Sequence, residues 1–196
     1  MTSQEYNYEL KIPKERIAVL IGKKGVIKRE IEASTKTKLN IDSKEGDVLI
    51  YGEDAMGIFT AREVIEAIAR GFNPEFARLL LKTDYVLVIV DIKDFAGKNN
   101  ETALRLKGRV IGKDGKSRKT IEFFTETKIC VYGKTIGIIG KPEGVESARR
   151  AVESLLKGAP HGNVYKVLEN KKRELTIKEL SGEGSLDERE GKEQIQ

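Results

Sequence analysis

The chain has 196 residues, and its 36 Lys and Arg against 31 Asp and Glu give a net charge of +5 with the single histidine neutral. Hydrophobic residues make up 39% of the chain, which is too many for a wholly disordered protein, and no apolar run approaches the roughly 20 residues of a membrane span. Its one cysteine, Cys130, cannot form an internal disulfide, and one cysteine with one histidine cannot complete a zinc site. We therefore expect a cytoplasmic protein with no metal.

The first part of the chain predicts a small mixed domain. Tyr6–Ile12 alternates polar and apolar residues as a strand does, and a short helix is expected on each side of the glycine loop at 22–25. Two further strands, Lys38–Ile41 and Asp47–Tyr51, are joined by a turn, and an amphipathic helix over Ala55–Arg70 is stopped by a glycine.

The same order of elements recurs about 90 residues later. Leu20–Gly25 matches Val110–Gly115 at an offset of 90, and Thr35–Leu39 matches Thr125–Ile129 at the same offset. The unit is too long for a solenoid repeat, so it indicates two copies of one domain. The order strand-helix-helix-strand-strand-helix predicts an α+β fold in which each copy packs a three-stranded antiparallel sheet on three helices.

Composition and periodicity also set the expected boundaries. The first domain should span 1–71 and the second 85–158, with a helical bridge at 72–84 between them. A partly helical extension is expected at 159–180, and the glycines and acids of 181–196 are typical of a disordered tail.

The positive charge is concentrated in the later copy. Residues 1–71 hold 12 basic and 12 acidic side chains, whereas residues 72–170 hold 18 and 12. Within the second copy, Arg105–Lys119 carries seven cations against the single anion Asp114. A solvated helical face would account for such a run, but glycines inside it favour another interpretation.

Each copy has a Gly-x-x-Gly loop between two helices. Glycine permits positive φ and a close approach of ligand to backbone, and the N-terminus of the following helix favours an anion. Lysines in the loop add positive charge, so the natural ligand is a phosphodiester backbone. A floor formed by Ile111, Ile121 and Ile129 would let unpaired bases lie flat, which favours single-stranded nucleic acid; a purely structural turn is the alternative.

The expected contacts in the second copy divide into three kinds. Gly112 and Gly115 should give backbone approach, four cations should face phosphates, and two isoleucines should touch bases. The candidate residues are Gly112, Lys113, Asp114, Gly115, Lys116, Arg109, Ile111, Arg118 and Ile129, and a possible second site comprises Gly22, Lys23, Lys24 and Gly25. Because the first copy has no net charge, we expect the second to be the main RNA clamp and the first to dock a protein or orient the molecule.

The two loops, Ile21–Gly25 and Ile111–Gly115, resemble the signature of KH domains, and the element order resembles their type I arrangement over about residues 5–158. Such loops clamp about four backbone nucleotides. The resemblance therefore implies two tandem type I KH domains that bind RNA.

A narrower resemblance rests on Leu106–Arg118, Ala148–Ala151 and Gly158–Tyr165. These segments are similar to the "partner of Nob" family of small-subunit ribosome assembly factors. That resemblance implies binding near the 3′ end of small-subunit pre-rRNA and cooperation with the Nob endonuclease. Eukaryotic members have generally lost the first glycine loop, so Gly22 and Gly25 favour an archaeal member. A general KH protein acting on messenger or small RNA, and an RNA-binding subunit of a nuclease complex, remain alternatives.

Enzyme motifs are incomplete. Gly115-Lys116-Ser117 resembles the end of a nucleotide-binding P-loop, but that motif needs a glycine where Val110 stands. His161 lies in a Gly/Pro turn, and no Ser or Cys has a recognisable catalytic partner. We therefore expect no catalytic residues and no cofactor, and we expect Cys130 to be a packing thiol on a strand.

Overall fold

The computed structural model describes the backbone from Tyr6 to Ser181 and side chains up to Ile177. The tail expected at 181–196 lies outside the described residues, apart from the last residue of a helix. The first domain comprises β1 (Tyr6–Lys11), α1 (Lys14–Ile21), α2 (Val26–Thr35), β2 (Lys38–Ile41), β3 (Asp47–Gly52) and α3 (Ala55–Ala69). The second comprises β4 (Val86–Asp91), α5 (Lys93–Ala96), α6 (Asn100–Ile111), α7 (Lys116–Thr125), β5 (Lys128–Tyr132), β6 (Thr135–Gly140) and α8 (Pro142–Leu156).

Three helical segments lie outside this shared order. Between the domains, α4 (Pro74–Ala77) continues into the 3₁₀ turn η2 (Arg78–Leu81). After the second domain, the extension is one long helix, α9 (His161–Ser181), where only partial helix was expected. The single turn α5 was not predicted, because four residues are too few to show a helical period.

Both sheets have the predicted three antiparallel strands, with the last strand of each domain in the centre. Their orders are β1-β3-β2 and β4-β6-β5. The registers are equivalent: Tyr8 pairs with Ile50 in the first sheet, and Val88 pairs with Ile138 in the second. This topology places the strand that follows the second of the two helices around each glycine loop, β2 after α2 and β5 after α7, at one edge of its sheet.

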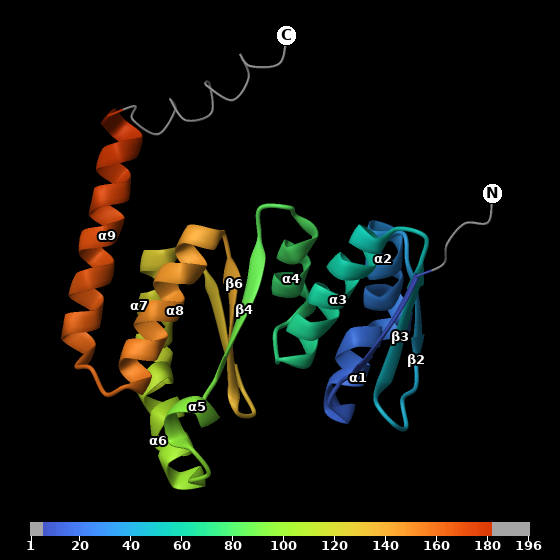
Figure 1. The fold of residues 1–196 in the computed structure, drawn as a ribbon, viewed down its shortest axis with the longest axis horizontal. Helices are drawn as coiled ribbons and strands as arrows, with labels where there is room; N and C mark the ends of the chain where they lie inside the picture. The colour runs from blue at the N-terminus through green and yellow to red at the C-terminus, as the bar shows by residue number, and fades with distance from the viewer. Residues whose placement is uncertain (1–5, 182–196) are drawn as a thin grey trace.

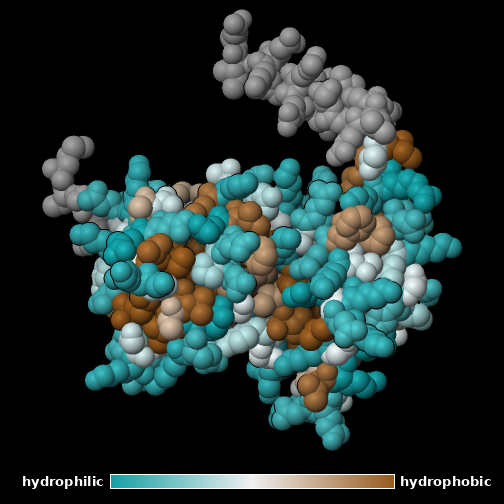
Figure 2. Space-filling view, turned by 180° about the vertical axis from the view of Figure 1, so that it is seen from behind, coloured by the Kyte–Doolittle hydropathy of each residue, from teal (hydrophilic) through white to brown (hydrophobic). Residues whose placement is uncertain are grey.

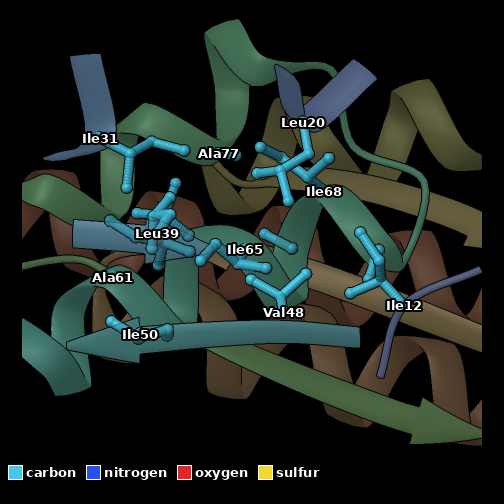
Figure 3. Packing of buried hydrophobic residues seen from close by; sticks show 14 of the residues in the cluster. Ile12, Leu20, Ile31, Leu39, Val48, Ile50, Ala61, Ile65, Ile68 and Ala77 are labelled. Carbon is cyan, nitrogen blue, oxygen red and sulfur yellow. The ribbon is translucent and has the colours of Figure 1, made fainter. Parts of the chain in front are cut away.

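The first core lies between its sheet and its three helices. Val48 and Ile50 point inward from β3, where period-two alternation puts every second side chain on one face. Leu20 from α1, Ile31 from α2 and Ile65 from α3 meet them, and all five side chains are fully buried (Figure 3). Burying each such side chain contributes about 1.5–3 kcal/mol.

The central strand of the second sheet is covered on both faces. Every residue of β6 is buried, whereas burial alternates along β3. Helix α3 and the bridge helix α4 lie between the two sheets and cover the outer face of the second one (Figure 1). Phe72 lies against Gly137, where an added Cβ would come within 2.6 Å of the ring, and Ile139 joins the core of the first domain. Two-sided burial explains why β6 does not alternate in sequence.

Polar contacts border this domain interface. The Tyr132 hydroxyl donates to a carboxylate oxygen of Glu15 at 2.5 Å, and this bond lowers the pKa of Glu15 and raises the pKa of Tyr132. The guanidinium of Arg16 lies 5.8 Å from the Tyr132 ring centroid. It also donates to the carbonyl oxygens of Ile68 at 2.8 Å and of Phe72 at 2.6 Å. Arg16 thus ties α1 to the last turn of α3 and to the start of the bridge.

We predict that the domain interface depends on Phe72, which is 2% exposed. Phe72→Ala should lower the free energy of unfolding by about 3–5 kcal/mol, because it leaves a cavity over Gly137. Urea denaturation measures the change. The control is Phe59→Ala: Phe59 is 51% exposed, and its loss should change stability by less than about 0.5 kcal/mol. Equal losses for the two variants would contradict the interface described here.

Candidate nucleic-acid interface

The two glycine loops have the same backbone conformation. Gly112 has φ 71° and ψ 173°, and Gly22 has φ 72° and ψ 172°. The third loop position is left-handed in both, with φ 54° at Asp114 and at Lys24. Each loop forms a single 3₁₀ turn between two helices. The repeat therefore preserves the geometry of the turn although the side chains at its third position carry opposite charge.

The first glycine of the second loop is required by its surroundings. A φ of 71° with a ψ of 173° belongs to a region that is essentially restricted to glycine. A Cβ on Gly112 would lie 2.6 Å from the Cβ of Ser117, whereas a Cβ on Gly115 would meet only the end of Lys119 at 3.9 Å. Gly112 thus lets the loop lie directly on the first turn of α7.

The second loop faces solvent. Lys113, Asp114 and Lys116 are exposed, and Gly112 and Gly115 are partly exposed. No ion pair or side-chain hydrogen bond among residues 6–177 engages the ammonium groups of these two lysines. Across the same residues, no side chain caps the N-terminus of α7. Unpaired backbone N–H groups, the positive end of the helix dipole and free ammonium groups therefore converge on one turn, which suits a phosphate.

Arg109 requires a correction. We predicted that it faces phosphate, but its guanidinium donates to the carbonyl oxygens of Leu155 at 3.0 Å and of Ala159 at 2.7 Å. With Nε2 as the donor, His161 in turn hydrogen-bonds the carbonyl oxygen of Arg109 at 2.8 Å. Arg109 therefore links α6 to the end of α8 and the start of α9.

The predicted apolar floor also requires correction. Ile129 is 2% exposed and Ile121 is fully buried, so both side chains belong to the second core and cannot touch a base. Alternation along β5 turns Ile129 inward, and this inward position was not foreseen. Ile111, by contrast, is 37% exposed beside the loop.

Arg118 lies in the cleft between α7 and β5. Its Nη1 donates to the carbonyl oxygen of Ile129 at 3.4 Å, and its Nε is buried without a partner among the described residues. A hollow of about 190 Å³ lies here, and its lining includes Phe76 of the bridge and Lys128 of β5. The ammonium of Lys128 is 5.2 Å from the Phe76 ring centroid. Sequence reasoning missed both residues, because domain packing places them together.

Corresponding positions give the two domains different surfaces. Ile27 lies under the first loop where Ser117 lies under the second, and Val26, 51% exposed, stands where the second domain has Lys116. The hydroxyl of Ser117 is buried without a partner among the described residues. The second site is therefore more polar and more cationic than the first.

Cys130 is half-buried at the edge of the hollow beside Arg118. Burial raises the pKa of the Cys130 thiol, which suits a packing role. The part of the chain that the structure describes holds no cluster of three or more His, Cys, Asp or Glu suited to a metal. None of the helices between Tyr6 and Ser181 combines the length and apolar character that crossing a bilayer requires.

Comparison with protein families finds the same two units. A family model described as a eukaryotic-type KH domain of type I, the second KH domain of PNO1, matches residues 86–173. A general KH-domain model matches residues 7–67. The expectation of two tandem type I KH domains is confirmed, and the first of these models extends well into α9.

Similar proteins include archaeal and eukaryotic ones. The KH domain-containing protein MJ0443 of Methanocaldococcus jannaschii is 49% identical over 170 residues, which cover 85% of this chain and 74% of that protein. The RNA-binding protein pno1 of Dictyostelium discoideum is 30% identical over 172 residues, which cover 84% and 71%.

Solved structures of Dim2p proteins are similar to this chain in fold and in sequence. Dim2p from Pyrococcus horikoshii matches with a TM-score of 0.78 and 45% identity, over 84% of this chain and 99% of that one. A complex of a/eIF2alpha, aDim2p and rRNA from the same organism matches with a TM-score of 0.81 and 44% identity, over 87% and 96%.

We predict unequal costs for substituting the two glycines of the second loop. Gly115→Ala should lower the free energy of unfolding by about 1 kcal/mol, the cost of a left-handed residue with a Cβ. Gly112→Ala should cost about 3 kcal/mol, because it adds the overlap with Ser117 to a conformation that only glycine tolerates. Urea denaturation of both variants measures the difference. Equal costs would show that the close approach at Gly112 is not a constraint.

Proposed function

The chain belongs to the KH-domain family of ribosome assembly factors that contains pno1 and Dim2p, and we propose that it recognises the 3′-end region of small-subunit pre-rRNA and assists its maturation. The observation that carries this proposal is the exposed turn at Gly112–Gly115, where free lysine ammonium groups meet the uncapped start of α7. The similarity to a Dim2p solved together with rRNA supports the choice of ribosomal RNA as the ligand. We expect the protein to act in the cytoplasm.

The loop of the second domain would hold an unpaired strand by its backbone. Gly112 and Gly115 let the strand come close to main-chain N–H groups, and Lys113 and Lys116 neutralise phosphates. Ile111 supplies the exposed apolar contact for a base. Arg118 lies deeper, in the cleft beside β5, where its guanidinium can meet the edge of a base rather than a phosphate. Arg109 holds α6 against the end of α8 and does not contact RNA in this scheme.

The first domain would serve mainly to dock a protein or to orient the molecule. Its loop has the same conformation, with Lys23 and Lys24 exposed, but Ile27 and Val26 make the adjoining surface apolar. On the face drawn in Figure 2, apolar side chains gather over this domain. Residues 1–71 have no net charge, so the electrostatic attraction for RNA is weaker there. A Nob-type endonuclease is the partner that the family resemblance favours.

The chain would bind and present RNA without cutting it. Among residues 6–177 there is no cluster of acids and histidines that could hold a catalytic metal. Cleavage of the RNA end would therefore fall to the endonuclease, and this protein would hold the substrate in place for it.

We predict that Lys113 contributes an electrostatic contact to RNA in the second loop. Lys113→Ala should weaken binding of single-stranded RNA of any sequence and reduce the slope of log affinity against log salt by about 0.7, the value for one phosphate contact. Fluorescence anisotropy over a series of salt concentrations measures both effects. Lys23→Ala is the matched control, because Lys23 occupies the equivalent position of the first loop. A larger effect of Lys23→Ala would reverse the assignment of the two domains.

We also predict specificity for the rRNA end. The full chain should bind a strand with the sequence of the small-subunit rRNA 3′ tail more tightly than a scrambled strand of equal length. Crosslinking in cells should recover fragments from that end. Recovery of dispersed messenger or small RNAs would favour a general KH protein. Co-purification in equal amounts with an RNA-degrading complex would favour a nuclease subunit.

A further inference from the structure

The outer face of α7 carries a groove that begins at the glycine loop. Lys116, Lys119, Thr120 and Phe123 are spaced three, four and seven residues apart, so they line one side of the helix. Together with Asp114 and Phe124 they line a shallow hollow of about 480 Å³. From Gly115 to Phe123 the helix rises about 12 Å, so the groove continues well beyond the loop itself.

Phe123 lies at the far end of this groove and is 67% exposed. Phe124 packs against the second core and meets the Phe123 ring edge-on, with centroids 5.4 Å apart and planes at 70°. The ammonium of Lys172, on α9, lies 4.6 Å from the centroid of the Phe123 ring, donates to the Phe123 carbonyl oxygen at 3.2 Å and pairs with Glu126 at 3.4 Å. An exposed aromatic ring is thus held in place by neighbours from two helices, although the core does not need it.

The groove is cationic. The ammonium groups of Lys116 and Lys119 have no ion-pair or hydrogen-bond partner among residues 6–177, and both side chains are exposed. Among the residues that the structure describes, Asp114 is the only acidic one that lines the groove. Free positive charge beside an exposed aromatic ring is the combination that binds single-stranded nucleic acid without sequence preference.

The first domain lacks this surface. At the offset of 90, Ala33 stands where the second domain has Phe123, and Glu30 stands where it has Thr120. Glu30 is paired at 2.6 Å with Arg78 of the bridge, so an acidic contact with η2 occupies that face. Since the same fold forms with alanine at this position, the fold does not require Phe123.

We propose that this groove is a second RNA subsite. A single strand held at the Gly112–Gly115 loop continues along the outer face of α7, with phosphates near Lys116 and Lys119 and a base stacked on Phe123. The inference rests on the proposed function, because it extends the same RNA beyond the loop. Charge complementarity and direct continuity with the loop favour RNA over a protein as the occupant.

A fluorescence experiment tests the stacking. The chain contains no tryptophan, so Phe123→Trp introduces a single indole reporter at the end of the groove. An RNA strand of about eight nucleotides should quench its emission, whereas a strand of roughly four, the length that a KH loop clamps, should not reach it. Phe59→Trp is the control, since Phe59 is an exposed aromatic residue of the first domain. Equal quenching of the two reporters, or no quenching of the Phe123→Trp variant by the longer strand, would overturn the subsite.

Affinity measurements with strands of two lengths test how much Phe123 contributes to RNA binding. Phe123→Ala in the full chain should weaken binding of the longer strand about tenfold and leave the shorter strand unaffected, because only the longer strand loses a stacked base. Val167→Ala is the control for removing an exposed apolar side chain, since Val167 is also 67% exposed but lies on α9 outside this groove. Equal weakening for both strand lengths would overturn the proposal, because it would assign Phe123 to the stability of the loop.

The outcomes separate this inference from the proposed function. If the unsubstituted chain binds the two lengths equally and Phe123→Ala changes neither, the subsite fails while RNA binding at the loop stands. If the unsubstituted chain binds neither strand, the proposed function fails. Quenching of the Phe123→Trp variant by a purified protein partner and not by RNA would identify the groove as a protein site and overturn the proposal.

Discussion

The contact of Phe72 with Gly137 joins the two domains into one stack. A side chain at position 137 would hold the ring away, so the absence of a Cβ there sets how closely the bridge can approach β6. With the bridge and α3 on the outer face of the second sheet (Figure 1), its central strand β6 is buried along its whole length. The second domain leaves open to a ligand the glycine loop, the outer face of α7 and the cleft between α7 and β5. The packing that stabilises the pair thus also limits where RNA can bind.

The backbone of the loop follows from sequence, whereas its surroundings do not. Two copies of Ile-Gly-Lys-x-Gly predict the same turn, and the dihedral angles of Gly22 and Gly112 agree within 1°. Strand order, helix order and exposure of the loop follow from local patterns, because they depend on nearby residues. The predictions for Arg109 and Ile129 were wrong because they concern tertiary packing. Arg109 has its partners at Leu155 and Ala159, about 50 residues away, and no local pattern shows such a contact.

Burial on both faces of β6 also depends on contacts between residues far apart in the sequence. An alternating pattern would have predicted one covered face, and the run Ile136-Gly-Ile-Ile does not alternate. Its meaning becomes clear only when the other domain is in place, because Phe72 and the first core cover the outer face of the strand. The hollow beside Arg118 is similar, since the bridge contributes Phe76 to it. Sequence thus predicts each domain better than it predicts the surfaces that the domains create together.

Arg16 and Arg109 make equivalent contacts in the two domains, because each donates to two backbone carbonyl oxygens near the end of the last helix of its domain. Arg16 binds the carbonyl oxygens of Ile68 and Phe72, and Arg109 binds those of Leu155 and Ala159, which stand 87 residues later in both cases. The donors do not correspond: the offset of 90 aligns Arg16 with Leu106 and Arg109 with Val19. A shared ancestral arginine therefore does not account for both contacts. Each domain thus reaches equivalent carbonyl groups, at and just beyond the end of its last helix, with an arginine from a different helical position, three residues apart in the alignment.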